Sequence, residues 1–249
     1  MISESNIFLS VFLPLRKGSK RVKNKNIRPF KNYKFGLTEL KINQLKKLKY
    51  IFSKTYKKKR IEFIISTNCK RISRYTKKFK WIKTFKRKES LAKDDSLDKL
   101  INHVPSICSG KYIMWTHVTS PFYNEKDYLN FIKMFLKIKN NKYQSAFSAD
   151  YLKKFIYVKK IGWVSHDYKR KKWPRTQKLS NSYIVNSAAF LTSRQIYLKN
   201  KDRLCNNPVP ILSRVGSGFD IDDMNDFKEL MKKENEKIYN SLFTKRHAF

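Results

Sequence analysis

The sequence is short of acidic residues, of cysteine and of the small residues that make flexible linkers. Its 249 residues include 19 Asp and Glu against 57 Lys and Arg, with only 6 Gly, 7 Pro and 3 Cys. Cys69, Cys108 and Cys205 are odd in number and far apart, which excludes a disulfide framework and a paired CxxC metal site. Unpaired cysteines suit a reducing compartment, so we expect a cytoplasmic protein.

Long apolar runs and targeting signals are also missing from the sequence. No stretch of about 18 apolar residues occurs, so we expect no membrane insertion. The N-terminus lacks the basic start, apolar centre and small-residue cleavage site of a signal peptide. Hydrophobic residues make up 41% and aromatics 14%, which excludes wholesale disorder. Without internal repeats or low-complexity linkers, the length predicts a single domain over residues 1–249.

The most abundant feature is positive charge, formally +38. Such a charge indicates a polyanionic partner, and nucleic acid is the default polyanion. However, 44 of the 57 cations are Lys, and Asn, Ile, Phe and Tyr are also frequent. All five residue types have A/T-rich codons, so a low-GC genome would enrich them without any selection for binding. A Lys-rich solvated surface and a nucleic-acid binder both stay open at this point.

The N-terminal half alternates apolar runs with amphipathic stretches. Ile7–Leu13 is almost continuously apolar, as expected of a strand buried on both faces. Between Leu37 and Ile51, apolar residues recur every three or four positions and predict a helix. Further strands are predicted at 61–67, 81–85 and 111–118, and further helices at 69–79, 91–104 and 128–138. The alternation predicts an α/β fold with a parallel sheet, whose ligands bind at the carboxyl ends of the strands.

The pattern changes after about Tyr143. Strand-like stretches at 146–151 and 155–164 lead into a basic patch at Lys169–Lys172, and we interpret this region as an insertion or arm on the main sheet. A strand at 183–192 and a short helix at 194–200 follow. A short acidic edge at 219–223 then precedes a closing helix at 224–242.

The first stretch suited to chemistry is the loop Pro14–Phe30, directly after the first strand. It contains Gly18, Ser19 and six cations, namely Arg16, Lys17, Lys20, Arg21, Lys23 and Lys25. A Gly-containing loop after a buried strand can turn backbone N–H groups toward a phosphate while cations neutralise its charge. The Walker and GxGxxG patterns are both absent. An exposed basic loop without a ligand is the alternative.

Two further stretches carry polar groups. Asp220 and Asp222 lie two positions apart, so on an extended segment both carboxylates face one side and could hold magnesium. Alternatively, Asp222 or Asp223 caps the helix at Met224. The third stretch is Thr116–Pro121, where hydroxyls and an imidazole end a strand and suit a polar ligand, although Pro121 also simply stops a strand.

Together these stretches resemble the acylneuraminate cytidylyltransferases, the CMP-sialic acid synthetases and their relatives. The family's N-terminal loop is matched by Arg16, Ser19, Lys20, Lys25 and Asn26, continued by Arg28-Pro29-Phe30. Its QPTSP is similar to His117–Pro121, its STD to Ser66-Thr67-Asn68, and its RPxELA to Arg87, Glu89, Leu91 and Ala92, followed by Asp94, Asp95 and Ser96. Its PRTQ, NGAFY and DIDTPED resemble 174–177, 186–190 and 220–226. The matches cover almost the whole chain in the family's order.

The resemblance implies a Rossmann-like nucleotidyltransferase fold, with a mostly parallel central sheet, flanking helices and a dimerisation arm at about 149–182. It implies transfer of CMP from CTP to the anomeric hydroxyl of a sialic-acid-like keto-sugar acid, with release of pyrophosphate, in surface glycan biosynthesis. Magnesium is the implied cofactor. CTP, the sugar acid and a second copy of the chain are the implied partners, and nucleic acid is not among them.

The resemblance also implies roles for residues. Catalysis falls to Arg16, Lys20, Lys25 and Asp222, and nucleotide binding to Arg16, Gly18, Ser19, Lys25, Asn26, Arg87 and Ser96. Sugar binding falls to His117, Thr119, Ser120, Arg175, Gln177 and Asn186, and metal binding to Asp220 and Asp222. We expect a metal-activated sugar hydroxyl rather than His117 as base. A nucleotidyltransferase for another sugar or nucleotide, and a basic nucleic-acid-binding protein, remain the alternatives.

Overall fold

A computed structural model of the chain describes residues 7–93, 95–140 and 142–232. Its centre is a seven-stranded sheet in the order β3-β2-β1-β4-β8-β5-β9. The strands are β1 (Ile7–Leu15), β2 (Arg60–Thr67), β3 (Ile82–Lys86), β4 (Tyr112–Thr116), β5 (Ser145–Leu152), β8 (Ser182–Ser193) and β9 (Val209–Leu212). Only β8 runs against its neighbours, so the sheet is mostly parallel, as the alternation of strands and helices predicts.

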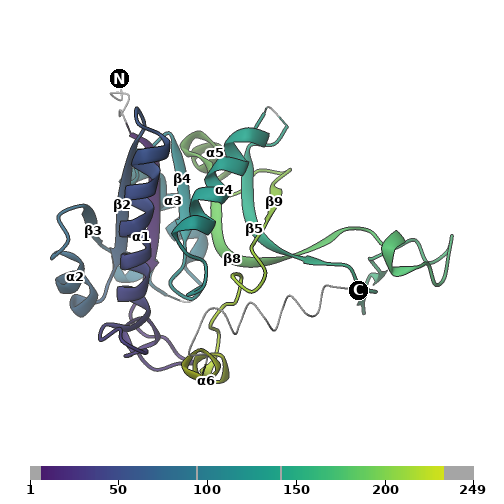
Figure 1. The fold of residues 1–249 in the computed structure, drawn as a ribbon, viewed down its shortest axis with the longest axis horizontal. Helices are drawn as coiled ribbons and strands as arrows, with labels where there is room; N and C mark the ends of the chain where they lie inside the picture. Colours follow the sequence, from purple (N-terminus) through teal and green to yellow (C-terminus); the bar gives the residue numbers. More distant parts are fainter. Residues whose placement is uncertain (1–6, 94, 141, 233–249) are drawn as a thin grey trace.

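Helices cover both faces of the sheet (Figure 1). They are α1 (Gly36–Thr55), α2 (Lys70–Thr76), α3 (Leu97–Ile107), α4 (Glu125–Ile138), α5 (Arg194–Asn200) and α6 (Met224–Lys232). On β1, Val11 and Leu13 belong to the apolar cluster that includes α1 and α4. Phe12, between them, belongs to the second cluster, with α3 and α5. Successive side chains of a strand point to opposite faces, so the continuous apolar run of β1 is explained by burial on both.

The third helix begins six residues later than its periodicity predicts. Glu89–Leu91 forms a single 3₁₀ turn, and α3 starts only at Leu97. The predicted start at Leu91 is therefore wrong. Leu91 packs against the second apolar cluster and also lines a cavity described below, so a partly buried side chain outside the helix continues the apolar pattern of α3 in the sequence.

Strand β9 is absent from the sequence-based prediction. Pro208 directly precedes this strand and Pro210 lies within it. Proline normally argues against a strand because it cannot donate a ladder hydrogen bond. The structure resolves the conflict by placing β9 at the edge of the sheet, paired only with β5. Edge strands tolerate proline because one side of the ladder is unpaired.

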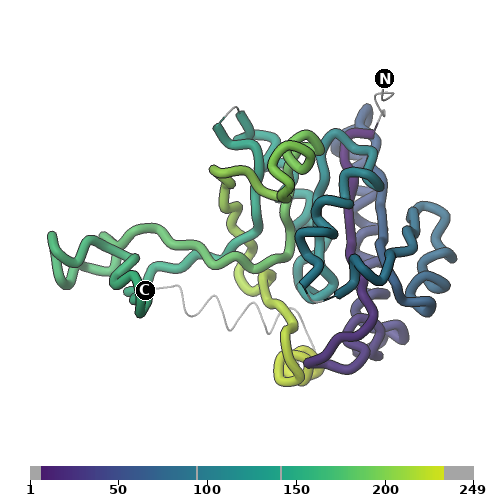
Figure 2. The backbone as a smooth tube through the Cα atoms, turned by 180° about the vertical axis from the view of Figure 1, so that it is seen from behind, coloured from purple at the N-terminus to yellow at the C-terminus, as the bar shows by residue number. Residues whose placement is uncertain are grey.

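The predicted insertion is a long arm that leaves the sheet between β5 and β8 (Figures 1 and 2). It carries a small hairpin, β6 (Tyr157–Val158) and β7 (Gly162–Trp163), and the 3₁₀ helix η3 (Thr176–Lys178). The predicted single strand at 155–164 is therefore two strands of two residues each. Phe155, Trp163 and Trp173 pack edge to face at the end of the arm, with ring centroids 5.4 to 6.2 Å apart. This aromatic cluster gives the arm a small core of its own.

The remaining sequence-based expectations concern membranes and the C-terminus. None of the helices in the described ranges is long and apolar enough to cross a membrane. The closing helix is present as α6 up to Lys232, and the rest of the predicted helix, to Leu242, lies outside the described residues. Asp94, quoted above for the family resemblance, also lies outside them.

Candidate active site

A cavity of about 510 Å³ opens at the carboxyl ends of β1 and β4, at the edge of the sheet where ligands of parallel sheets bind. Its volume is within the range of ligand sites for small molecules. Ten of the residues predicted from the sequence line it: Arg16, Ser19, Lys20, Lys25, Asn26, Arg87, Ser96, His117, Thr119 and Asp222. The cavity therefore collects segments from the N-terminal loop, the turn after β3, the end of β4 and the acidic edge.

The basic loop after β1 is held in place by hydrogen bonds to its neighbours. The backbone N–H of Lys17 donates to Asn68 Oδ1 over 2.8 Å, and Asn68 in turn donates to Glu89 over 2.9 Å. Asn26 donates its amide to the carbonyl of Arg16 over 3.0 Å and so closes the loop on itself. Gly18 adopts a φ of +87°, which favours glycine. The loop is therefore an ordered element and not a loose basic tail.

Lys25 joins this loop to the acidic segment. Its Nζ donates to the carbonyl of Ile221 over 2.6 Å, between Asp220 and Asp222. Burial lowers the pKa of Lys25, and the carboxylates of Asp220 and Asp222 oppose this shift. Residues almost 200 positions apart thus meet at one wall of the cavity.

The two predicted metal ligands differ in their surroundings. The side chain of Asp222 is 56% exposed and forms an ion pair with Arg21, with 2.8 Å between Asp222 Oδ1 and Arg21 Nη2. Asp220 is largely buried, and its Oδ1 has no hydrogen-bond partner. Burial raises the pKa of Asp220, a hydrogen bond from Thr119 lowers it, and the nearby charge of Asp222 raises it again. The cap of α6 is Asp223, which accepts the backbone N–H groups of Asn225 and Asp226 at 2.7 and 3.1 Å.

These surroundings fit a divalent cation. An orphaned, buried carboxylate oxygen with a second carboxylate close by is a donor set that a hard cation satisfies. Within residues 7–93, 95–140 and 142–232 no group of three His, Cys, Asp or Glu side chains could hold a metal. Magnesium commonly takes one or two carboxylates and completes its shell with water and substrate phosphates, so two suffice.

Arg16 and Arg87 are two of the three arginines that line the cavity. Arg87 donates to the Oγ and carbonyl of Ser66 over 3.1 and 2.7 Å at the end of β2. Burial, and to a smaller extent the neighbouring charge of Arg16, lower the pKa of Arg87 to about 10. An anion between them would relieve this like-charge repulsion. Ser96, at the start of α3, donates to the carbonyl of Lys93 over 2.6 Å and is almost fully buried.

His117 is held by Trp115, whose indole N–H donates to His117 Nε2 over 2.8 Å. Because indole is a donor only, the Nε2 atom carries no proton and Nδ1 does. Burial lowers the pKa of His117 to about 3, with nearby Arg203, Lys41 and Lys25 acting in the same direction. His117 is therefore a neutral hydrogen-bond donor through Nδ1, and a poor base. Trp115 also lines the cavity.

Ser120 lies behind the cavity and not in it. Its side chain is fully buried with no hydrogen-bond partner for Oγ. Its carbonyl accepts from Lys41, a lysine of α1 that is itself 0% exposed and also donates to the Tyr123 carbonyl and the Tyr128 hydroxyl, at 2.9 to 3.0 Å. Burial lowers the pKa of Lys41 to about 7. The predicted sugar-binding role of Ser120 thus finds no support in its position.

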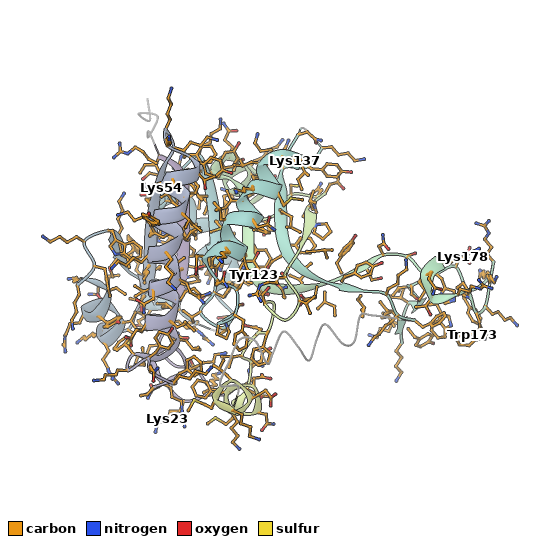
Figure 3. The ribbon with its side chains drawn as sticks, viewed as in Figure 1. Lys23, Lys54, Tyr123, Lys137, Trp173 and Lys178 are labelled. Atoms are coloured by element: carbon orange, nitrogen blue, oxygen red, sulfur yellow. The ribbon has the colours of Figure 1, made fainter. Side chains whose placement is uncertain are left out.

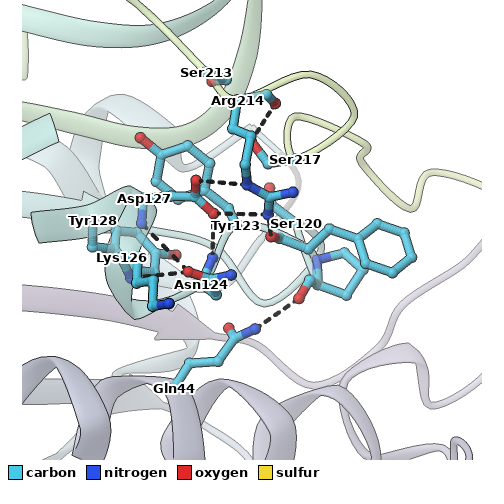
Figure 4. A network of polar contacts seen from close by, with 12 residues as sticks. Gln44, Ser120, Tyr123, Asn124, Lys126, Asp127, Tyr128, Ser213, Arg214 and Ser217 are labelled. Carbon is cyan, nitrogen blue, oxygen red and sulfur yellow. Dashed lines mark hydrogen bonds and ion pairs between the residues drawn. The ribbon is translucent and has the colours of Figure 1, made fainter. Parts of the chain in front are cut away.

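Arg214 also holds the turn at residues 120–123 in place (Figure 4). Arg214 forms two 3.2 Å hydrogen bonds to the carboxylate of Asp127 and one of 3.1 Å to the Phe122 carbonyl. Its own carbonyl accepts from Ser217, in the loop that leads to Asp220. This turn also supports the acidic segment, because the Thr119 carbonyl accepts a hydrogen bond from the backbone N–H of Ile221. The sequence analysis singled out neither Lys41 nor Arg214.

Three predicted sugar-binding residues lie away from the cavity. Arg175 and Gln177 are exposed in the arm, beside Trp173 and Lys178, which Figure 3 shows at the far end from Lys23. Asn186 is buried in β8, where it accepts from Ser148 and donates to Ser213. Within one chain, the structure therefore does not bring Arg175, Gln177 or Asn186 together with His117. Gly18 belongs to the loop but does not line the cavity.

Comparison with known proteins places this fold among nucleotidyltransferases. No protein-family model matches the sequence, and no curated protein matches it. A solved structure of CMP:2-keto-3-deoxy-manno-octonic acid synthetase complexed with CTP superposes with a TM-score of 0.60 at 10% identity, covering 96% of this chain and 99% of that one. The 4-diphosphocytidyl-2C-methyl-D-erythritol synthase of Anaerococcus prevotii DSM 20548 gives 0.58 at 10% identity, covering 97% and 98%. HddC from Yersinia pseudotuberculosis, complexed with GMP-PN, gives 0.51 at 12% identity, covering 92% and 100%.

These likenesses extend over nearly the full length of each chain. They show that this chain has the Rossmann-like fold of these proteins, as the resemblance in the sequence implies. At 10 to 12% identity the likeness concerns the fold alone. What the chain does follows from its own site.

Proposed function

We propose that this chain is a cytidylyltransferase that transfers CMP from CTP to the anomeric hydroxyl of a sialic-acid-like keto-sugar acid and releases pyrophosphate, for surface glycan biosynthesis. The observation that carries the proposal is the cavity itself: an ordered cationic loop faces the carboxylate of Asp222 at the carboxyl ends of parallel strands. Asp220 does not line the cavity, but its carboxylate lies close to that of Asp222. A triphosphate and a divalent cation need these opposite charges side by side.

The triphosphate is bound by the N-terminal loop. Arg16, Lys20 and Lys25 neutralise its charge, and Ser19 lines the cavity beside them. Gly18, with its positive φ, sets the turn of the loop that brings the backbone toward the phosphates. The sugar oxygen attacks the α-phosphorus in line with the departing pyrophosphate. Stabilising the charge on the phosphoryl oxygens is usually the largest contribution to such transfers, and preorganised cations provide it. Asn26, Arg87 and Ser96 face the nucleoside from the loop, the turn after β3 and the start of α3.

Asp220 and Asp222 would hold the magnesium ion. When bound, it supplies charge neutralisation at the phosphates and lowers the pKa of an oxygen that binds it. To bind the cation, Asp222 would give up its ion pair with Arg21, and Arg21 would then be available to contact a phosphate. Both side chains of that pair are more than half exposed, so the exchange costs at most about 1 kcal/mol.

His117 acts in sugar binding rather than as general base. A group with a pKa of about 3 takes up a proton poorly at neutral pH, and its Nε2 already accepts from Trp115. The free Nδ1–H donates to a sugar hydroxyl or carboxylate, with Thr119 beside it on the same turn.

The protein works as a homodimer through its arm. Arg175 and Gln177 are too far along the arm to serve the cavity of their own chain, so a partner's cavity is where Arg175 would meet the sugar carboxylate. The exposed apolar residues at the base of the arm, Tyr183, Ile184 and Val185, are 39 to 50% exposed and suit burial against a second copy.

The central experiment measures pyrophosphate release from CTP, UTP and GTP with a panel of keto-sugar acids and with neutral sugar phosphates. We expect release with CTP and one of the keto-sugar acids only, abolished by EDTA and restored by magnesium. Activity with UTP and a neutral sugar phosphate, and none with CTP, would contradict the proposal. A nucleic-acid-binding protein would give no release with any pair.

Asp222→Asn tests the acidic pair. We expect it to lower the rate at least a hundredfold, because the carboxylate is lost from the metal site, while the fold is unchanged. Asp98→Asn makes the same chemical change at an exposed position of α3 that does not line the cavity, and should leave the rate unaltered. Equal loss in both variants would argue against a role for Asp222.

The dimer is tested by mixing inactive subunits. A heterodimer of Asp222→Asn with Arg175→Ala contains one cavity with all its carboxylates that receives the unaltered arm. Activity should therefore reappear on mixing. A protein that stays monomeric in sedimentation, or a mixture that stays inactive, would refute this arrangement of the arm.

A further inference from the structure

A second cationic site lies on the other side of the N-terminal loop. Two adjoining cavities, of about 240 and 430 Å³, share Lys34 and Arg71 in their walls. Six cations line them in total: Lys23, Arg28, Lys34, Arg71, Arg74 and Lys78. We name these two cavities together the basic groove. It lies between the loop that precedes α1 and the outer side of α2.

Among the described residues, the positive charge of the basic groove is offset by one carboxylate only. Its one carboxylate, Glu39, accepts a 2.7 Å hydrogen bond from the backbone N–H of Phe35. In the part of the chain that the structure describes, none of the six cations forms an ion pair. Six cations gathered around a hollow with a single carboxylate repel one another, and an anion from solution relieves that repulsion.

Composition explains this cluster poorly. Lysine is abundant throughout the chain, but arginine is not, with 13 residues in 249. Three of those 13 arginines, Arg28, Arg71 and Arg74, line the groove. A guanidinium presents a planar fork that matches phosphate bidentately, whereas a lysine is a point charge. Arginine is thus enriched at the place where phosphate recognition would require it.

The groove and the candidate active site share a wall. Val22, Lys25 and Asn26 line the active-site cavity, whereas Lys23 and Arg28 from the same segment line the groove. This segment is ordered, with a 3₁₀ turn over Lys25–Ile27 and a 2.8 Å hydrogen bond from the N–H of Arg28 to the Asn24 carbonyl. A ligand on one side therefore acts on residues that form the other side.

We propose that the basic groove is a second anion site that binds a soluble polyphosphate, an anion with two or more phosphate groups, and that its occupancy changes nucleotide binding across the loop. Two adjoining hollows with separate guanidinium groups fit several linked phosphates better than a single one. Recessed hollows fit a small soluble anion better than a flat membrane surface. The site does not depend on the proposed function, because binding is measured directly.

The test is calorimetric titration of the whole chain with inorganic triphosphate at fixed ionic strength. We expect two sites in the wild type, one of them in the active-site cavity. Arg71→Ala/Arg74→Ala should lose one site, with its Kd raised at least tenfold. Lys133→Ala/Lys137→Ala removes the same charge from exposed positions of α4 and should keep both sites. Arg71→Lys/Arg74→Lys keeps the charge without the fork, and we expect it to weaken the same site.

The outcomes separate the explanations. Unchanged stoichiometry in the Arg71/Arg74 variant, or an equal loss in the Lys133/Lys137 variant, would overturn the site. Sedimentation with phosphatidylglycerol vesicles that depends on Arg71 and Arg74, without a second triphosphate site, would overturn the assignment to a soluble ligand. If the proposed function were wrong and the active-site cavity bound no triphosphate, one site would remain in the wild type and disappear in the variant.

The effect across the loop needs a separate readout. Triphosphate should inhibit CTP binding in a way that departs from simple competition in the wild type, because it acts at both sites. In Arg71→Ala/Arg74→Ala the inhibition should become purely competitive. A purely competitive pattern in both proteins would overturn the coupling.

Discussion

The buried lysine of α1 makes a measurable prediction about stability and pH. Burial lowers the pKa of Lys41 from 10.5 to about 7, opposed by the charges of Asp127 and Glu125. Between these two pH values the unfolded chain holds a proton that the folded chain has released. The free energy of unfolding therefore rises with pH across this window, by up to about 1.4 kcal/mol per pH unit. Below pH 7 both states are protonated, and the cost of burying the charge is present in full.

Lys41→Met removes this dependence. The variant no longer buries a charged amine. In the wild type, burying that charge costs about 5 kcal/mol, from the difference between the two pKa values. The variant also leaves the carbonyls of Ser120 and Tyr123 without a donor, at about 1 to 3 kcal/mol each. The two effects nearly cancel at pH 6. At pH 9.5 the wild type has recovered most of the cost, so the variant should be less stable by about 3 kcal/mol.

The assay is urea unfolding followed by tryptophan fluorescence at several pH values from 6 to 9.5. The wild type minus Lys41→Met difference cancels every other titrating group, such as the tyrosines whose pKa burial raises. Lys47→Met, at an exposed position of the same helix, is the control and should show no such trend. A difference that stays constant between pH 7 and 9.5 would refute the reasoning, because Lys41 would then titrate in its usual range.

Three further predictions concern other parts of the molecule. Gly36→Ala should lower the Tm by more than about 8 °C, because φ is +59° and a Cβ would lie 2.1 Å from the Arg28 carbonyl oxygen. Gly18→Ala, with φ +87° and open space around the Cβ, should lower the Tm by about 2 to 4 °C. A similar decrease in Tm for both variants would contradict the clash at Gly36. Cys205 should be the first cysteine to react with a thiol reagent, as measured by peptide mapping. Burial raises the pKa of Cys205, but hydrogen bonds from Ser145 and from backbone N–H groups outweigh this effect and lower it, whereas burial raises the pKa of Cys108. Faster labelling of Cys108 would contradict this order. His117→Gln should keep most of the pyrophosphate release, and the wild-type rate should show no inflection near pH 6.5, since the pKa of His117 is about 3; loss of such an inflection in the variant would identify His117 as a base.

Much of the fold was predictable because its signals are local. The apolar run of β1 and the helical periodicity of α1 depend on a residue's immediate neighbours in sequence, and both elements are present within two to four residues of the predicted limits. The start of α3 and the whole of β9 were not predictable in this way. Leu91 is partly buried against the second apolar cluster without belonging to α3, so its apolar side chain extends the helical pattern beyond the helix. The prolines of β9 are tolerated because that strand lies at an edge, which is a property of the sheet order.

The residues of the candidate site were predictable or not for the same reason. The loop residues Arg16 and Lys25 and the acidic segment could be proposed from their position after strands, where a parallel sheet gathers its ligands. Arg175 could not be placed, because the reach of the arm is a matter of three-dimensional shape. Lys41 did leave a signal, since it lies four residues from both Leu37 and Leu45 on the buried face of α1. A lysine on an apolar stripe requires a partner, and the carbonyls of the 120–123 turn provide it.

The scarcity of acids gives the charge its meaning. With three cations for every acid, an ordinary surface carboxylate would find a basic neighbour anywhere, so its position would carry little information. The acids around the site have specific neighbours instead: Asp127 fixes Arg214 behind the turn, Asp223 caps α6, and Asp220 keeps a buried oxygen without a partner. The basic groove is the complementary case, because six cations line it against the single carboxylate of Glu39. Both features surround one loop, and this is why anions on its two faces should affect each other.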